Sequence, residues 1–397
     1  MAHAGAFLFC AEEYFVHKRI RDSPDDFTDL QLWLNSSSCT GALTEALTQN
    51  TSIQQVTLLI HESFGDTSTT TGTTSDLQRQ NISNLFRVLG RLPQLQQLFL
   101  NTYRFPFVAT LPIKAFSNLF EGAHQLIAFK LWRTDLYGCC QGDVDAWAHA
   151  LAGTCVCLQE FRLIKCRLTE EHEEEAIRDD SGTFGTMDSI LVALSTLPAL
   201  QEVELSATKL SALGTLSSES LRQLLRGSRS LQSFSLMHFD LSEAAVISIA
   251  ESLHVYHQQT GAPSIDTATQ QNHRQSLPQR QRGSLKHVKL SGVGSTASMF
   301  RQPIRDAFRS ALESNYLLET LFIFDEGNLR DEIRFYLKLN RLGRYQLLQQ
   351  APVITTQRGG RFQEWIEILV QVHDDLNCLF YFLHECPLLL SGGWHCY

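Results

Sequence analysis

Apolar residues recur along the chain in one short string: an apolar position, two variable positions, an apolar position, one variable position and a third apolar position. The alternation at the end of the string is typical of a strand with one buried face. The pattern predicts eight strands, named here by their three apolar residues: Ile53/Val56/Leu58, Leu95/Leu98/Leu100, Leu126/Phe129/Leu131, Leu158/Phe161/Leu163, Leu200/Val203/Leu205, Leu231/Phe234/Leu236, Leu285/Val288/Leu290 and Leu318/Leu321/Ile323.

Helical patterns separate these strings. Where no insertion intervenes, the first positions of neighbouring strings lie 31 to 33 residues apart, and apolar residues between them follow a 3.6-residue period. One strand with one helix cannot bury its apolar face alone, so the units must stack side by side. The pattern predicts helices over Ile82–Leu89, Ala115–Phe120, Val144–Leu151, Met187–Leu194, Leu221–Leu225, Ala244–Leu253 and Ile304–Leu312.

Four of the strings continue in a way that is characteristic of one repeat family. The continuations are Thr134-Asp-Leu136, Cys166-Arg-Leu168, Thr208-Lys-Leu210 and Phe239-Asp-Leu241, at the place where leucine-rich repeats favour Asn, Cys or Thr before an apolar residue. Residues 41–324 therefore resemble the leucine-rich repeat superfamily of the ribonuclease-inhibitor type. The resemblance implies an α/β solenoid of horseshoe shape, with an inner parallel β-sheet of about eight strands and outer α-helices.

Three polar stretches interrupt the repeats and predict surface insertions near residues 61–80, 169–186 and 258–283. The solenoid is expected over residues 41–330, after an N-terminal segment of residues 1–40 and before a helical C-terminal cap of residues 331–397. Leu43, Ala46 and Leu47 predict a helix ahead of the first strand. Two pieces of the cap, Glu332–Arg344 and Asp374–Leu383, are similar to the C-terminal segment of uncharacterised algal proteins of the diatom type.

Composition narrows the class of protein. Hydrophobic residues make up 43% of the 397 residues, which is enough for a substantial core. The net charge of −9 argues against nucleic acid or an anionic membrane as a partner. No run of about 18 apolar residues predicts a membrane span, and ten cysteines are too few for a disulfide-rich scaffold. We expect a cytoplasmic protein.

The chain carries no familiar catalytic motif. Gly-rich phosphate loops, Gly-x-Ser-x-Gly elbows and His-Glu-x-x-His helices do not occur. Cysteines and histidines gather near the C-terminus, but their spacing does not match a structural zinc site. The close pairs Cys139/Cys140 and Cys155/Cys157 are interpreted as packed thiols rather than redox pairs. The sequence therefore predicts no enzyme, no cofactor and no metal.

Strand geometry predicts where a partner binds, because residues that alternate with buried ones point to the opposite face. Large aromatic side chains beside arginine are typical of protein interfaces, so we expect a protein partner on the concave β-face. Phe322 and Phe324 belong to the same face, but the C-terminal cap could cover them. The predicted binding residues are Phe99, Asn101, Lys130, Trp132, Glu160, Arg162, Ile164, Glu204, Met237 and Lys289.

The leading hypothesis is a non-enzymatic protein-binding scaffold. An alternative is a regulatory protein, such as a GTPase-activating or enzyme-inhibitor-like leucine-rich repeat subunit, because horseshoes of this type also have that role. A GTPase activator would need an arginine presented on a loop, for which Arg133 and Arg178 are candidates. A third alternative, a fragment of an immune-type sensor, ranks last because no nucleotide-binding module precedes the repeats.

Overall fold

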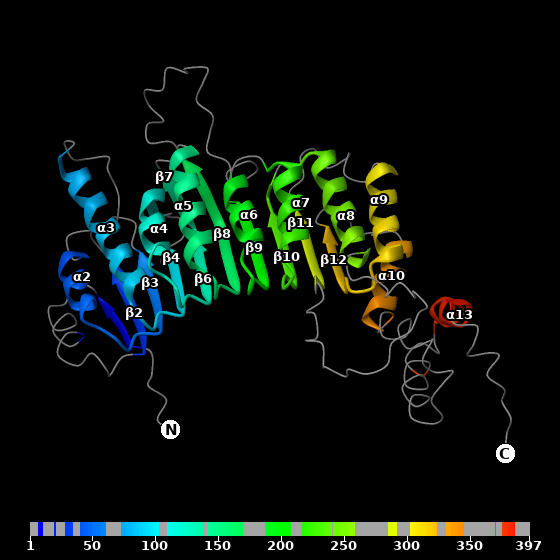
Figure 1. The fold of residues 1–397 in the computed structure, drawn as a ribbon, viewed down its shortest axis with the longest axis horizontal. Helices are drawn as coiled ribbons and strands as arrows, with labels where there is room; N and C mark the ends of the chain where they lie inside the picture. The colour runs from blue at the N-terminus through cyan, green and yellow to red at the C-terminus, as the bar shows by residue number, and fades with distance from the viewer. Residues whose placement is uncertain are drawn as a thin grey trace, which may run out of the picture.

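The computed structural model describes residues 7–10, 20, 28–34, 40–60, 73–102, 109–137, 141–169, 187–207, 216–239, 241–258, 285–291, 302–323, 331–342, 344, 370 and 375–385. In these residues, strands and helices alternate along an elongated molecule (Figure 1). The strands are β1 (Phe7–Cys10), β2 (Asp29–Leu34), β3 (Gln55–Ile60), β4 (Gln97–Thr102), β5 (Ala109–Pro112), β6 (Ala128–Trp132), β7 (Thr134–Tyr137), β8 (Glu160–Thr169), β9 (Glu202–Ala207), β10 (Ser233–Met237), β11 (His287–Ser291) and β12 (Thr320–Ile323). The helices are α2 (Thr40–Thr48), α3 (Thr73–Arg91), α4 (Ile113–Phe120), α5 (Gln141–Thr154), α6 (Asp188–Ser195), α7 (Ser218–Gly227), α8 (Glu243–Gln258), α9 (Gln302–Ser314), α10 (Asp331–Arg341) and α13 (Leu376–Glu385).

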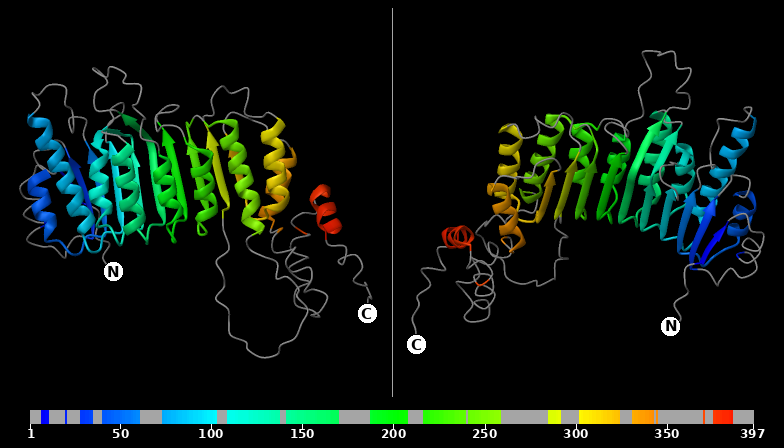
Figure 2. Two further views of the ribbon diagram at one scale, coloured as in Figure 1. Left: turned by 45° about the horizontal axis from the view of Figure 1, so that its top comes forward. Right: turned by 180° about the vertical axis from the view of Figure 1, so that it is seen from behind.

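The main sheet is parallel and follows the order of the chain: β1-β2-β3-β4-β6-β8-β9-β10-β11-β12. Helices α2 to α9 also pack against their sequence neighbours, and they lie along one face of the sheet (Figures 1 and 2). The fold is therefore α/β with repeated strand–helix units, as the sequence predicts. A second, small sheet pairs β5 with β7 and β7 with the second half of β8.

One backbone contact repeats at the start of the strands and explains why their register is constant. The carbonyl of Gln54 accepts hydrogen bonds from the amides of Gln96 and Gln97, at 2.7 and 3.0 Å. The same two-amide contact recurs from strand to strand through the carbonyls of Gln96, Ile127, Gln159, Gln201, Gln232 and Lys286. Each strand thus fixes where the next one begins, and this order persists across the intervening insertions.

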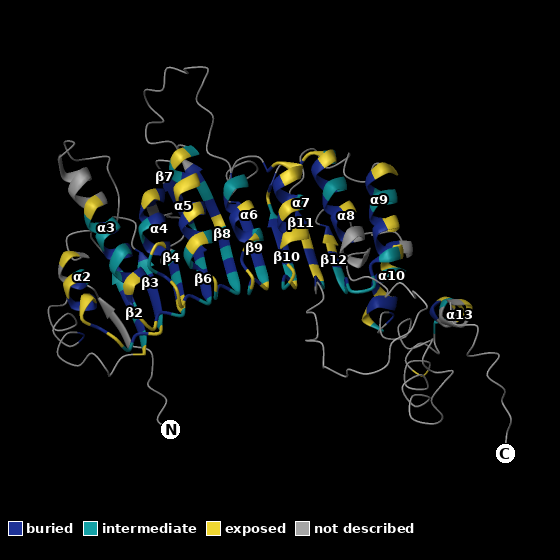
Figure 3. Ribbon diagram, viewed as in Figure 1, coloured by how far each residue is buried: buried dark blue, intermediate teal, exposed yellow. Residues whose placement is uncertain are grey.

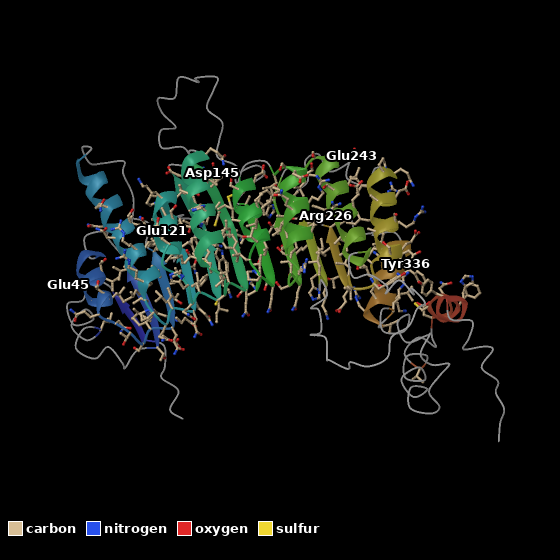
Figure 4. All side chains as sticks on the ribbon, in the orientation of Figure 1. Glu45, Glu121, Asp145, Arg226, Glu243 and Tyr336 are labelled. Atoms are coloured by element: carbon tan, nitrogen blue, oxygen red, sulfur yellow. The ribbon has the colours of Figure 1, made fainter. Side chains whose placement is uncertain are left out.

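The core lies between the sheet and its helices. The second and third apolar residues of every predicted string are buried, as the pattern requires. Phe116 and Phe120 of α4 pack on Trp147 of α5 and on Phe129 of β6, with ring centroids 5.0 to 6.2 Å apart. Burial of each such side chain contributes about 1.5–3 kcal/mol. The opposite sides of the helices carry exposed residues such as Glu45, Asp145 and Arg226 (Figures 3 and 4).

The last unit is closed by polar contacts from the C-terminal segment. Arg344 is buried and donates hydrogen bonds to the carbonyls of Leu312 and Glu313, at 3.0 and 2.8 Å. Asn340 of α10 donates to the carbonyls of Asn315 and Leu318. These donors satisfy carbonyls at the end of α9 and in the turn that follows, which would otherwise lack partners. The guanidinium of Arg344 also lies 4.3 to 5.1 Å from three tyrosine rings, those of Tyr316, Tyr336 and Tyr381.

Two expectations about the elements need correction. In the part of the chain that the structure describes, the main sheet has ten strands rather than about eight, because β1 and β2 precede the first predicted strand. Helix α3 begins at Thr73, so the insertion predicted near 61–80 is shorter than expected. Its remaining residues, like 170–186 and 259–283 of the other two insertions, lie outside the described residues. Within the described residues, no helix is both long enough and apolar enough to cross a membrane.

Candidate functional site

The ten residues predicted to bind a partner all lie on the face of the main sheet opposite α2–α9, which we call the open face. In-register pairing aligns them in columns across the strands. One column contains Phe99, Lys130, Arg162, Glu204, Ser235, Lys289 and Phe322 in that order. A second column places Asn101 beside Trp132, and Trp132 beside Ile164. The predicted binding residues on neighbouring strands are therefore adjacent across the open face.

An apolar group occupies one part of the open face. Phe99 and Trp132 form an aromatic pair, with ring centroids 6.4 Å apart and planes inclined by 50°. Ile164 is the neighbour of Trp132 on the next strand, and all three side chains are half-buried. The indole Nε1 of Trp132 is buried and finds no hydrogen-bond acceptor within the described part of the chain.

A network of charged side chains borders this apolar group. Lys130 Nζ lies 3.0 Å from Glu160 Oε2, and Arg162 Nε lies 2.5 Å from Glu160 Oε1. Arg162 also donates a hydrogen bond of 2.8 Å to Glu202 Oε2 and lies 3.7 Å from Glu204 Oε2. Arg162 is consequently the centre of three carboxylates that come from β8 and β9.

The network carries more negative than positive charge. It contains three carboxylates (Glu160, Glu202, Glu204) against two cations (Lys130, Arg162), which gives a net charge of −1. Burial lowers the pKa of Arg162, but the hydrogen bond to Glu202 and the three carboxylate charges outweigh it, so this pKa is raised above its ordinary value. Both cations are already bound by glutamates. The charge left to face a partner is therefore a carboxylate.

Two predicted residues stand apart from this group. Met237 is separated from Ile164 by Ser206 of β9, which is buried. Lys289 is exposed and lies 5.8 Å from the ring centroid of Phe322, whose exposed fraction is 48%. Phe322 is therefore uncovered, whereas Phe324 lies outside the described residues. Asn101 is half-buried beside Trp132 and belongs to the central group by position.

Glu202 is the member of the network that was not among the predicted binding residues. It lies two residues before Glu204 on β9, outside the first column and directly across from Glu160, and it accepts the hydrogen bond from Arg162. The alternation of the strand already placed Glu202 on the open face. Its contact with Arg162 depends on the register between β8 and β9. The sequence does not predict that register, because an insertion separates the two strands.

The residues considered for other chemistry are not assembled into a site in the described part of the chain. Cys155 is buried, and burial together with the nearby Cys157 raises its pKa to about 12. No three described His, Cys, Asp or Glu side chains are grouped closely enough to hold a metal ion. Arg133 follows β6 with a positive φ of 52°, and its amide donates to the carbonyl of Ile164. Arg178, Cys139 and Cys140 lie outside the described residues.

The fold places the chain among parallel α/β proteins built from repeated strand–helix units. Comparison of the chain with models of known families and with curated proteins gives no match.

Proposed function

We propose that this chain is a leucine-rich repeat solenoid of the ribonuclease-inhibitor type, and that it serves as a non-enzymatic, cytoplasmic scaffold for a protein partner. The partner would bind the open face, and we propose that this face is the concave surface of the horseshoe expected from the sequence. The observation that carries the proposal is the half-buried Phe99–Trp132 pair beside the ion-pair network of Arg162.

Three features support this function. The repeat spacing and the constant parallel register agree with a solenoid whose units expose one sheet face. Aromatic residues together with arginine are enriched among the side chains that dominate the energy of protein interfaces. Charged groups around an apolar centre are typical of the rim of such interfaces.

The test compares how much of a protein partner is captured by the wild-type chain and by variants of the full chain. Phe99→Ala combined with Trp132→Ala removes the aromatic pair, whereas Trp132→Phe keeps a ring and loses an indole N–H that has no acceptor among the described residues. We expect the double variant to lose capture at least ~30-fold, which is the effect of removing a strong interface residue. Trp132→Phe should retain most of it.

Two controls make the result interpretable. Val192→Ala changes an exposed apolar residue on α6, on the helical side of the molecule, and should leave capture unchanged. Circular dichroism and thermal unfolding must show that each variant is folded. Capture that is equal for the wild-type chain and the folded double variant would place the binding surface elsewhere.

A further inference from the structure

The open face is divided into two bands that run across the strands. The first, the apolar band, consists of Phe99, Trp132 and Ile164. The second, the acidic band, consists of Glu160, Glu202 and Glu204. Trp132 and Ile164 lie two residues further along their strands than the column of Lys130, Arg162 and Glu204. Phe99 lies in that column itself, beside Lys130. The bands are therefore neighbours on the same surface, and Trp132 and Ile164 extend the apolar band toward the carboxyl ends of the strands.

The negative charge of the acidic band favours a partner with positive charge. Lys130 and Arg162 are held within 3.0 Å of glutamate oxygens, so neither cation is available to attract an anion without breaking an existing pair. Glu204 makes the longest contact of the network, 3.7 Å to Arg162, and it is the carboxylate least compensated by a cation. A basic side chain placed over Glu202 and Glu204 would balance the surplus charge, whereas an acidic one would be repelled.

The spacing of the strands selects the conformation of the partner. Neighbouring strands lie about 4.8 Å apart, and one turn of an α-helix advances about 5.4 Å. A helix that lies across the strands therefore presents about one side chain to each strand. An extended segment in the same direction would present a side chain toward the sheet only every ~6.7 Å, and it would fall out of step with the strands.

The same spacing of the strands gives the distance between the apolar and the basic side chain that the partner helix would need. Trp132 is on β6 and Glu204 is on β9, with β8 between them, so measured across the strands the two residues are two strand steps, or about 9.6 Å, apart. Seven residues of an α-helix advance about 10.5 Å and return to nearly the same side of the helix. A helix of about 10 Å diameter also covers both bands at once.

We propose that the partner segment is a basic amphipathic α-helix. A large apolar side chain would pack on the apolar band, and a lysine or arginine about seven residues away would pair with Glu202 and Glu204. This inference rests on the proposed function, because it names the chemistry of the segment that would dock on the open face.

The test selects binders without knowledge of the natural partner. A phage-displayed library of random 20-residue peptides is panned on the immobilised full chain, and the enriched peptides are synthesised for binding measurements. We expect them to be helical and to combine large apolar residues with Lys or Arg about seven positions away. Their binding should weaken at least ~10-fold for Glu202→Gln combined with Glu204→Gln, and it should decrease as salt increases. It should remain unchanged for Val192→Ala.

A variant with reversed charge tests whether the carboxylates determine which peptides bind. Glu202→Lys combined with Glu204→Lys, once shown to be folded, should reject the basic peptides and should enrich acidic ones from the same library. Acidic or neutral peptides that bind the wild-type chain and depend on Trp132 would overturn the inference while leaving the proposed function standing. Peptides that bind equally to the Phe99→Ala/Trp132→Ala variant would overturn the proposed function itself. A library that yields no binder above background would also overturn the inference.

Discussion

Gly90 of α3 is the position where a single methyl group should matter most for the stacking of the repeats. A Cβ atom at Gly90 would lie 2.1 Å from the carbonyl oxygen and 2.9 Å from the carbonyl carbon of Leu119 in α4. Gly122 approaches from the other side, since its Cβ would lie 2.9 Å from the carbonyl oxygen of Gly90. The backbones of neighbouring units therefore touch at these two glycines, and the obstacle to a side chain is main chain that cannot rotate away.

The magnitude follows from this distance. Ordinary van der Waals contact for a Cβ begins near 3.4 Å, so Gly90→Ala must separate α3 from α4 locally by about 1.3 Å. Overpacking of this kind costs about 1–3 kcal/mol or more, while alanine gains up to about 1 kcal/mol over glycine in a helix. We expect a net loss of about 1–2 kcal/mol in the free energy of unfolding.

Gly153 of α5 provides the matched control. A Cβ there meets no atom within 4 Å, so Gly153→Ala should stabilise the chain by about 0.5–1 kcal/mol. Urea unfolding followed by circular dichroism measures both variants against the wild-type chain. If Gly90→Ala is as stable as Gly153→Ala, the helices do not pack as closely as described and the reasoning is refuted.

Three further predictions concern polar and ionisable groups. Arg344→Lys cannot keep both hydrogen bonds to the carbonyls and the contacts with the tyrosine rings, so it should lower the free energy of unfolding by about 2 kcal/mol. The control Arg229→Lys, at an exposed site, should have no effect. Equal unfolding curves for the two variants would contradict this prediction. Burial raises the pKa of Cys155 and Cys166 to about 12, so both thiols should resist alkylation in the native chain, and stability should fall above pH 9, where unfolded thiols ionise first. That fall, by about 1.4 kcal/mol per pH unit per thiol, should diminish when either residue is replaced by alanine, and an unchanged slope would contradict it. Asp375 accepts hydrogen bonds from Lys338 and from the backbone amides of Asn377 and Cys378 at the start of α13. Asp375→Ala removes all three, so amide exchange in α13 should become faster. The same contacts lower the pKa of Asp375 to about 2, so the wild-type chain should lose this protection only as the pH falls from about 4 to 2.

The eight predicted strings all became strands because their period is set by burial on one side of a sheet, which is a local property. The strand β2 was missed, although Phe27, Leu30 and Leu32 carry the same string with phenylalanine in first place. The strand β5 has no such string, and it pairs with β7 outside the main sheet. The small sheet is thus a product of tertiary pairing, which a single sequence does not encode in its hydrophobic period.

In the candidate site, the sequence predicts the position of the apolar residues but not the ion pairs of the charged residues. Phe99 and Trp132 could be placed on one face by alternation, and their contact follows from the register of β4 with β6. The partners of Arg162 could not be chosen in advance, because carboxylates stand both on its own strand and on the next. Their selection depends on how β9 aligns with β8, and that alignment comes from the backbone contact of Gln159 with Gln201 and Glu202.

The ion pairs on the open face contribute little to the folding stability of the free chain. Their side chains are 19% to 35% exposed, and pairs in such a position contribute about 0–1 kcal/mol each to folding. A partner that covers them removes water and strengthens the same interactions, because the local dielectric falls. The network can therefore discriminate between basic and acidic partners far more strongly than it stabilises the free chain. Neutral substitutions at Glu202 and Glu204 should accordingly change binding much more than the unfolding temperature.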